Sequence, residues 1–166
     1  MFQLKTLTQE AIPAALEKAQ RYRMLDEPLE AESICLDVLA VDPKNGDALV
    51  TLILALTDQF QYRFTETFDP ARALLDSLPD DYNRAYYRGI IFERCAKASL
   101  KQSAPGSGFA AYDLFREAME SYEKAEKLRP RSNDDAILRW NTCARYLNRH
   151  PEVQSEPVER SIEMLE

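Results

Sequence analysis

The chain has 166 residues and a formal net charge of −7, with 45% hydrophobic and 30% charged residues. This length and composition predict one soluble globular domain rather than a disordered chain. The acidic charge argues against nucleic acid as a partner, because phosphate binding needs a basic patch.

The sequence shows no segment that would export the chain or anchor it in a membrane. Its first residues lack the apolar stretch of a secretory signal, and the most apolar run, residues 48–56, is too short to cross a bilayer. We therefore expect a cytoplasmic protein without membrane insertion, in which Cys35, Cys95 and Cys143 are reduced thiols. His150 is the only histidine and no cysteines form a CxxC pair, so we expect neither a metal site nor a cofactor.

Apolar residues recur at helical spacing through the first half of the chain. Thr6 or Thr8 can cap the first predicted helix, and Pro28 suits the first turn of the second, where no amide donor is needed. The third helix is almost entirely apolar and is expected to be central. Asp69 and Pro70 are expected to start a short fourth helix. The four predicted helices cover residues 8–25, 28–41, 47–60 and 69–78.

Three longer helices are predicted in the second half. Asp81 can cap the first of them, and a serine- and glycine-rich loop at residues 103–108 precedes the second. An acidic tail follows the third helix and carries one amphipathic set, formed by Val158, Ile162 and Leu165. No strand pattern competes, and the short connections predict that sequential helices pack as antiparallel neighbours in an all-α fold. The three helices are expected over residues 82–100, 109–128 and 134–148.

One helix-and-stop pattern occurs twice. Small and larger residues alternate at steps of four and three, which places them on one helical face, and a proline five residues later ends the helix. Two copies in a chain of this length indicate an internal repeat. The copies are Ala31-Cys35-Val38-Pro43 and Ala118-Tyr122-Ala125-Pro130.

This repeat resembles the tetratricopeptide repeat (TPR), a helix hairpin of about 34 residues. Ala19 and Ile53 are 34 residues apart, and the steps from Ala31 to Ile53 and from Ala118 to Trp140 are both 22 residues, as in that family. The resemblance implies antiparallel hairpins stacked as a short right-handed superhelical solenoid of about seven helices. The implied parts are a domain over residues 1–149, with repeats at about 8–44, 45–80 and 81–131 and a capping helix at 133–149, and the acidic tail at 150–166.

The middle of the chain departs from the family spacing. The intervals indicate insertions near residues 59–68 and 99–112, and a fourth helix about one turn short. Trp140 occupies a position where the family prefers a small residue. We favour a terminal capping helix with no successor to crowd it, and the alternative is a tryptophan that stacks on a ligand.

TPR proteins bind extended or helical peptides on the concave surface formed by the first helix of each repeat. Carried onto this chain, the resemblance implies a largely apolar groove that recruits a peptide or protein segment. Two alternatives stay open: the groove is free to bind a partner, or the chain itself fills it through residues 99–112 or the tail. The implied inner positions are Leu16, Gln20, Val50, Leu54, Tyr86, Ile90, Ile137 and Asn141, with Tyr87, Arg94 and Arg145 at the margin.

The resulting prediction is a non-catalytic scaffold or adaptor for a protein or peptide partner. The clamp that some family members use for chaperone tails is absent, since Leu16 and Gln20 stand where lysine and asparagine would be needed. An enzyme is not expected, because the chain has one histidine and no glycine-rich phosphate loop, and its aspartate pairs suit helix starts. The alternatives are a self-assembling module that forms a homodimer through its tail or an end repeat, and a small secretion-type chaperone.

Overall fold

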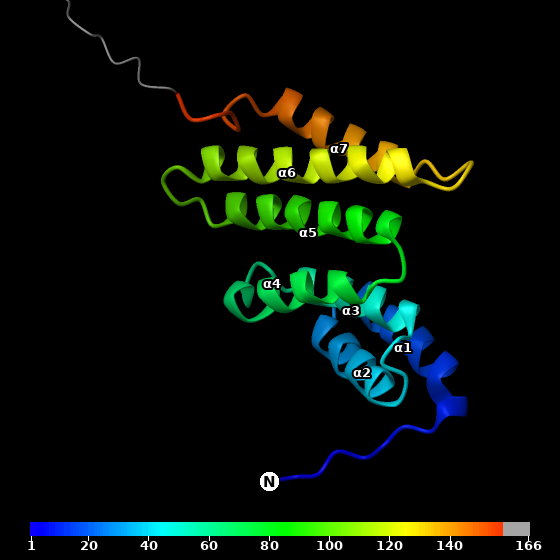
Figure 1. Ribbon diagram of the computed structural model, residues 1–166. Coiled ribbons are helices and arrows are strands. Elements are labelled where there is room, and N and C mark those ends of the chain that lie inside the picture. The colour runs from blue at the N-terminus through cyan, green and yellow to red at the C-terminus, as the bar shows by residue number, and fades with distance from the viewer. Residues whose placement is uncertain (158–166) are drawn as a thin grey trace, which may run out of the picture.

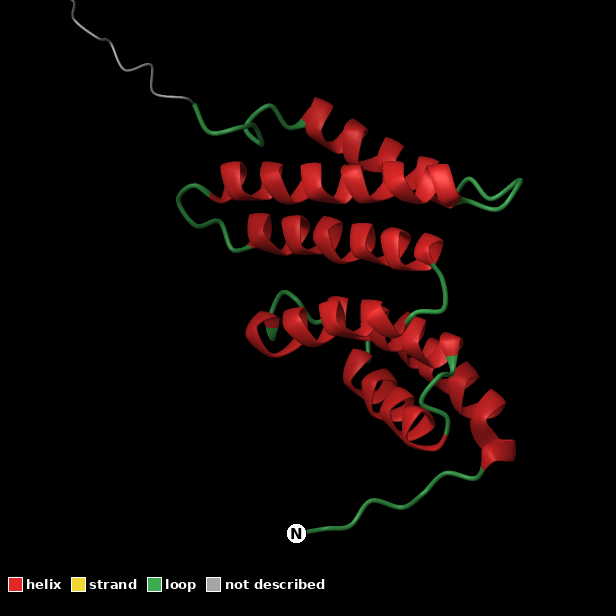
Figure 2. Cartoon of the chain, viewed as in Figure 1, coloured by secondary structure: helices red, strands yellow, loops and turns green. Residues whose placement is uncertain are grey.

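The computed structural model describes residues 1–157. Within this part the chain forms seven α-helices and two short 3-10 turns, with no strand, which confirms the predicted all-α class (Figure 2). The predicted tail set of Val158, Ile162 and Leu165 lies outside the described residues. The helices are α1 (Ile12–Met24), α2 (Pro28–Val41), α3 (Gly46–Thr57), α4 (Phe64–Ala73), α5 (Asp81–Lys101), α6 (Ser107–Leu128) and α7 (Asp135–Arg149).

Sequential helices pack against one another, as the short connections predicted. Contacts join α1 to α2, α2 to α3, α3 to α4, α5 to α6 and α6 to α7, and α3 also touches α1 and α5. Figure 1 shows α5 and α6 running antiparallel side by side, with α7 on the far side of α6 and the first four helices beyond α5. None of the helices in residues 1–157 is long and apolar enough to cross a membrane.

The helix starts follow the expected chemistry with two corrections. Asn45 caps α3 by accepting a hydrogen bond from the Ala48 amide at 2.9 Å, and Pro28 opens α2 as predicted. Asp80, and not Asp81, caps α5: its carboxylate accepts from the Asn83 amide at 2.7 Å. Thr8, which was one of the two predicted caps of the first helix, makes no capping hydrogen bond through its side chain.

The fourth helix begins earlier than predicted and contains the proline that was expected to start it. Phe60, Phe64 and Phe68 lie at steps of four, and their ring centroids are 5.5 Å and 4.9 Å apart along the series. This aromatic ladder stabilises helical turns before Pro70, so the second half of the expected insertion near residues 59–68 is the first part of α4. The missing amide of Pro70 removes one helical hydrogen bond, and the helix gives way to a 3-10 turn at Leu74–Ser77.

The second expected insertion, residues 99–112, lengthens the α5–α6 hairpin. Residues 99–101 complete α5, and residues 107–112 form the first turns of α6. Gly106 turns the chain between them with a left-handed φ of 79°. These residues therefore do not fill an inner groove, which corrects that alternative. The described start of the tail crosses the beginning of α6, where a Cβ on Gly108 would lie 2.7 Å from the carbonyl oxygen of Glu152.

The α5–α6–α7 core is organised around one tyrosine. Tyr122 on α6 is fully buried, and its ring lies so close to Gly89 on α5 that a Cβ there would come within 2.4 Å of a ring carbon. The same Tyr122 belongs to the repeated small–large–small pattern, with Ala118 and Ala125 also buried on its face of α6. The pattern thus identifies a packing face correctly. A glycine on the facing helix is what allows so close an approach.

Candidate functional site

Two of the residues expected on an apolar inner surface are core residues. Leu16 is 8% exposed and packs with Ile12 and Val38, whereas Ile90 is 1% exposed and packs in the cluster around Tyr122. The expectation that Leu16 and Ile90 line an open groove is therefore corrected. Neighbouring helices occupy the space that a bound peptide would need there.

The other expected positions divide between partly buried and exposed surface. Val50, Leu54, Tyr86 and Tyr87 are half-buried and pack against the two large cores. Gln20 and Arg145 are exposed, and Ile137, Asn141 and Arg94 are intermediate. Only Arg94 and Arg145, which were expected at the margin, lie in a hollow of the surface. The apolar strip is thus largely covered by the protein itself.

A hollow in the protein surface lies toward the carboxyl ends of the odd-numbered helices. One hollow of 640 Å³ is lined by residues of α1, α5 and α7 and by residues 57–61 at the end of α3, and a second of 240 Å³ continues it along α7. Both are lined by Lys97 and Tyr146, so we treat them as one groove and call it the cationic groove. Its basic side chains are Arg23, Arg94, Lys97, Lys101, Arg145 and Arg149.

The hairpin arrangement explains why basic residues gather there. Helices separated by two positions in the chain run in the same direction, so α5 and α7 end on the same side of the molecule while α6 runs the opposite way (Figure 1). Helix carboxyl ends favour cations, and Arg23, Lys101 and Arg149 lie in the last turns of α1, α5 and α7. Lys97 and Arg145 lie one turn further back, where the helix dipole has little effect, so they need another explanation.

The floor of the groove is fixed by one aspartate. Asp58, directly after α3, accepts a hydrogen bond from Arg23 Nε at 2.7 Å and pairs with the guanidinium of Arg94. Arg94 also donates to Thr57 Oγ1 at 2.6 Å and to the carbonyl of Leu54 at 3.2 Å, and its burial lowers its pKa from the ordinary value. This network joins α1, α3 and α5 and leaves the two arginines with fixed positions.

A second carboxylate lies behind the groove wall. Glu93 on α5 is 1% exposed and accepts hydrogen bonds from Tyr122 Oη at 2.6 Å, Lys97 Nζ at 2.5 Å and Arg139 Nη1 at 3.4 Å. Burial and the neighbouring Glu93 raise the pKa of Tyr122 well above its ordinary value, so its hydroxyl stays a donor. The cluster connects α5, α6 and α7, and it engages Lys97 from within the protein.

Three basic side chains of the groove have no acidic partner in the part of the chain that the structure describes. Lys101, Arg145 and Arg149 are exposed and form no ion pair within residues 1–157. The lining holds six lysine and arginine side chains against two aspartates, Asp26 and Asp58, although the whole chain carries −7. The groove is therefore net basic in a chain that is net acidic.

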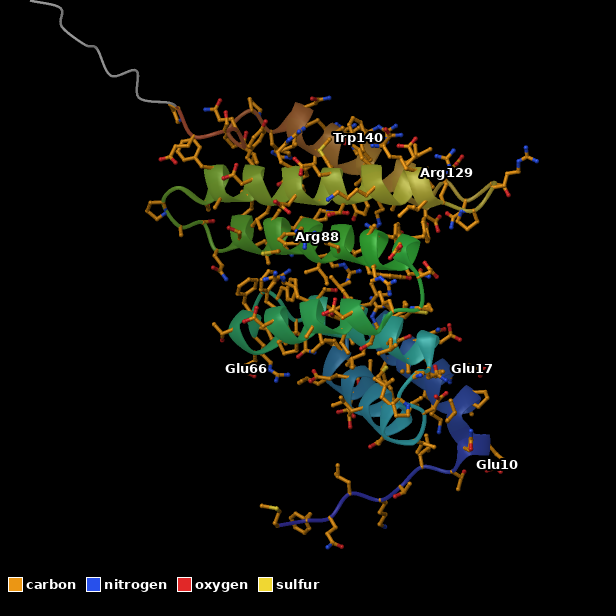
Figure 3. The ribbon with its side chains drawn as sticks, viewed as in Figure 1. Glu10, Glu17, Glu66, Arg88, Arg129 and Trp140 are labelled. Atoms are coloured by element: carbon orange, nitrogen blue, oxygen red, sulfur yellow. The ribbon has the colours of Figure 1, made fainter. Side chains whose placement is uncertain are left out.

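The acidic residues lie elsewhere. Figure 3 labels three exposed glutamates away from the groove: Glu10 in the turn before α1, Glu17 on α1 and Glu66 on α4. Because the rest of the chain is net acidic, a diffusing anion would be attracted to the groove more than to the rest of the surface. Electrostatic complementarity of this kind directs a charged ligand to a particular surface.

The groove holds none of the cysteines. All three are buried, and burial raises the pKa of the Cys35 and Cys143 thiols to about 12 and that of Cys95 to about 11. Protonated, inaccessible thiols are poor nucleophiles, so the buried position of Cys95 does not favour reactivity. No group of three histidine, cysteine or acidic residues within residues 1–157 could hold a metal ion.

Trp140 does not line the groove. Its indole Nε1 donates to Glu123 on α6 at 3.0 Å, and its ring packs in the cluster between α6 and α7 (Figure 3). Tyr146 is the aromatic residue of α7 that reaches the groove, where its ring stacks against His150 at a centroid distance of 4.3 Å. The sequence contained a signal for this site, because basic residues lie in the last turns of α1, α5 and α7. The repeat register instead predicted binding residues in the middle of the helices.

No known protein family, curated protein or solved structure matches this chain.

Proposed function

We propose that the protein is a non-catalytic scaffold that binds a polypeptide segment in the cationic groove. We further propose that its hairpins form a short TPR-like solenoid, in which the odd-numbered helices supply the binding face. The contacts of α3 with both α1 and α5 support this arrangement, since the first helices of successive repeats are neighbours in such a solenoid.

The observation that carries the proposal is the construction of the groove. Residues of α1, α5 and α7 and residues 57–61 converge on one hollow, and its floor is already fixed by the pairing of Asp58 with Arg23 and Arg94. A site with side chains ordered in advance loses less entropy when a ligand binds. The larger hollow also has the size of typical ligand sites, which are about 300–1,000 Å³.

An elongated partner fits this geometry better than a compact small molecule. The two hollows continue one another from α1, past Lys97 and Tyr146, to the end of α7. Their lining offers charged and hydroxyl groups along its length, beside the apolar side chains of Phe60, Ala98 and Leu100. A polypeptide segment can make several such polar contacts in succession, as in other groove-binding modes.

Site-directed photo-crosslinking tests this proposal. p-Benzoylphenylalanine is introduced in place of Lys101, inside the groove, or in place of Lys124, an exposed lysine of α6 outside it. We expect the groove position to form protein adducts that the control position does not form. The adducts are identified by mass spectrometry, and binding is then measured with the purified partner. Equal adducts at both positions, or none at Lys101, would contradict binding in the groove.

Self-assembly remains the alternative that the sequence left open. Leu128 and Leu138 are 52% and 62% exposed near the free end of the α6–α7 pair. Isolated exposed leucines are ordinary on monomer surfaces, so they favour a homodimer only weakly. Nothing in the described residues favours the secretion-type chaperone over a general scaffold.

A further inference from the structure

We propose that the segment bound in the cationic groove is acidic, and that Lys101, Arg145 and Arg149 bind its carboxylates. This inference rests on the proposed function and names the chemistry of the partner. It begins from the difference between the basic side chains whose charge is satisfied within the protein and those whose charge is not.

Three of the six basic side chains already have internal partners. Arg23 and Arg94 pair with Asp58, and Lys97 pairs with Glu93. These interactions hold the helices together and account for their presence without a ligand. They also place a fixed positive lining beneath any bound segment.

The other three have no such internal explanation in the described chain. Lys101, Arg145 and Arg149 are exposed and form no ion pair within residues 1–157, yet all three line the same groove. The helix dipole accounts for a cation in the last turn of α5 and of α7, but not for Arg145, one turn earlier. Three like charges along one groove repel each other, and an anionic partner would relieve this repulsion.

The spacing of the cations indicates an extended partner. Arg145 and Arg149 are four residues apart on α7, and Lys97 and Lys101 are four apart on α5, so each pair presents two cations about 6 Å apart along its helix axis. Alternate residues of an extended chain are separated by about 6.6 Å. Acidic residues at every second position of a bound strand would therefore match the spacing of Arg145 and Arg149 on α7.

Polypeptide carboxylates are favoured over nucleic-acid phosphates. Two aspartates, Asp26 and Asp58, lie within the lining, and the whole chain carries −7. A polyphosphate chain longer than the groove would run onto an acidic exterior, where its charge is repelled. A short acidic segment can place its carboxylates on Lys101, Arg145 and Arg149 and then leave the groove.

The test is a selection from a displayed library of random peptides, carried out on the full chain and on two triple variants. The groove variant is Lys101→Gln, Arg145→Gln and Arg149→Gln. The matched control is Lys18→Gln, Arg116→Gln and Lys124→Gln, which removes the same charge from exposed residues outside the groove that form no ion pair in residues 1–157.

We expect the wild type and the control to enrich peptides rich in aspartate and glutamate, with acidic residues at alternate positions. A synthetic copy of a selected peptide should bind the groove variant at least about tenfold more weakly than the control, and a glutamine-for-glutamate copy should bind the wild type at least about tenfold more weakly. Raising the salt from about 50 to about 300 mM should also weaken binding, because exposed charges are screened.

Four results would overturn the inference. Enriched peptides without an acidic excess would show that the groove binds a different chemistry, with the proposed function intact. Equal weakening by both triple variants would reduce the effect to overall charge. Tighter binding of a single-stranded oligonucleotide than of any selected peptide, with the same dependence on the groove residues, would replace the polypeptide by nucleic acid. Failure to select any peptide would overturn the proposed function together with this inference.

Discussion

The two halves of the molecule are stabilised in different ways. The α1–α4 half packs around apolar side chains, with Phe60 only 1% exposed and its ring in edge and tilted contact with the phenylalanines of α4. The α5–α7 half surrounds a carboxylate, Glu93, that is just as deeply buried and is bonded to Tyr122 and two cations. The polar side chains buried in the first half, such as Gln59, are neutral, whereas the second half buries a carboxylate. The first half therefore depends mainly on volume, and the second depends more on the position of polar groups. The cationic groove lies where the two halves meet.

The largest effect is expected in the apolar half. Phe60→Ala removes a buried ring from the aromatic ladder and should lower the free energy of unfolding by about 3–5 kcal/mol. Denaturant titration followed by circular dichroism measures this loss. Phe60→Leu is the control, and we expect it to cost less than about 1.5 kcal/mol because it keeps most of the volume. Similar costs for both substitutions would contradict a core held by volume.

The polar cluster should respond to the loss of its carboxylate. Glu93→Ala leaves the Tyr122 hydroxyl buried without its acceptor, and should cost about 2–3 kcal/mol. We expect this to be less than the loss at Phe60, because Lys97 and Arg139 are 39% and 35% exposed and can turn to water. Glu93→Gln keeps an acceptor and should cost less. Equal stability of Glu93→Ala and wild type in the same titration would show that the cluster contributes nothing.

The close approach of α5 and α6 gives a prediction about packing. Gly89→Ala places a methyl group within 2.4 Å of the Tyr122 ring, so the helices must separate, at a cost of about 1–3 kcal/mol. In the background of Tyr122→Leu, which removes the ring, the same substitution should cost less than about 0.5 kcal/mol. A double-mutant cycle measures this coupling. Additive effects would place the strain elsewhere.

The network beneath the groove should matter moderately. Asp58→Asn removes the charge shared by Arg23 and Arg94 and should lower the free energy of unfolding by about 1–2 kcal/mol. The loss should be smaller at high salt, since Arg23 and Asp58 are partly exposed. Thermal unfolding at low and high salt provides the measurement. A salt-independent loss would point to packing and away from charge.

The smallest effect is expected on the surface of the α5–α6 pair. Arg88 pairs with Glu117 at 2.9 Å and lies 4.7 Å from the centre of the Phe92 ring (Figure 3). Arg88→Gln should therefore cost only about 0.5–1 kcal/mol, because both contacts are partly exposed. A loss as large as that of Glu93→Ala would contradict the distinction between the buried cluster and its surroundings.

The sequence predicted most of the helices but not every boundary. Spacing and capping residues identified α2 with both of its ends, and α5 and α7 within one residue at each end. The sequence-based prediction was wrong at the start of α4. Pro70 was interpreted as the helix start, whereas the phenylalanines before Pro70 stabilise earlier turns. It also treated residues 99–112 as a separate insertion, since a count of residues does not show that the extra length extends two helices.

The candidate site was harder to predict than the fold. A repeat register identifies which face of a helix points inward, but it does not show whether a neighbouring helix already covers that face. Leu16 and Ile90 were covered, whereas Arg94 and Arg145, assigned only to the margin, line the cationic groove. The gathering of basic residues from α1, α5 and α7 depends on helix lengths and directions, and these are fixed only by the folded chain.

The central claim is that the ends of α5 and α7 form one binding surface for an acidic segment. Hydrogen–deuterium exchange, read by mass spectrometry with and without an acidic peptide selected on the full chain, tests it most directly. We expect slower exchange in residues 97–101 and 145–150 and no change in α2. Protection confined to α2 or to the residues before α1, or no protection at concentrations where the peptide is bound, would contradict the claim.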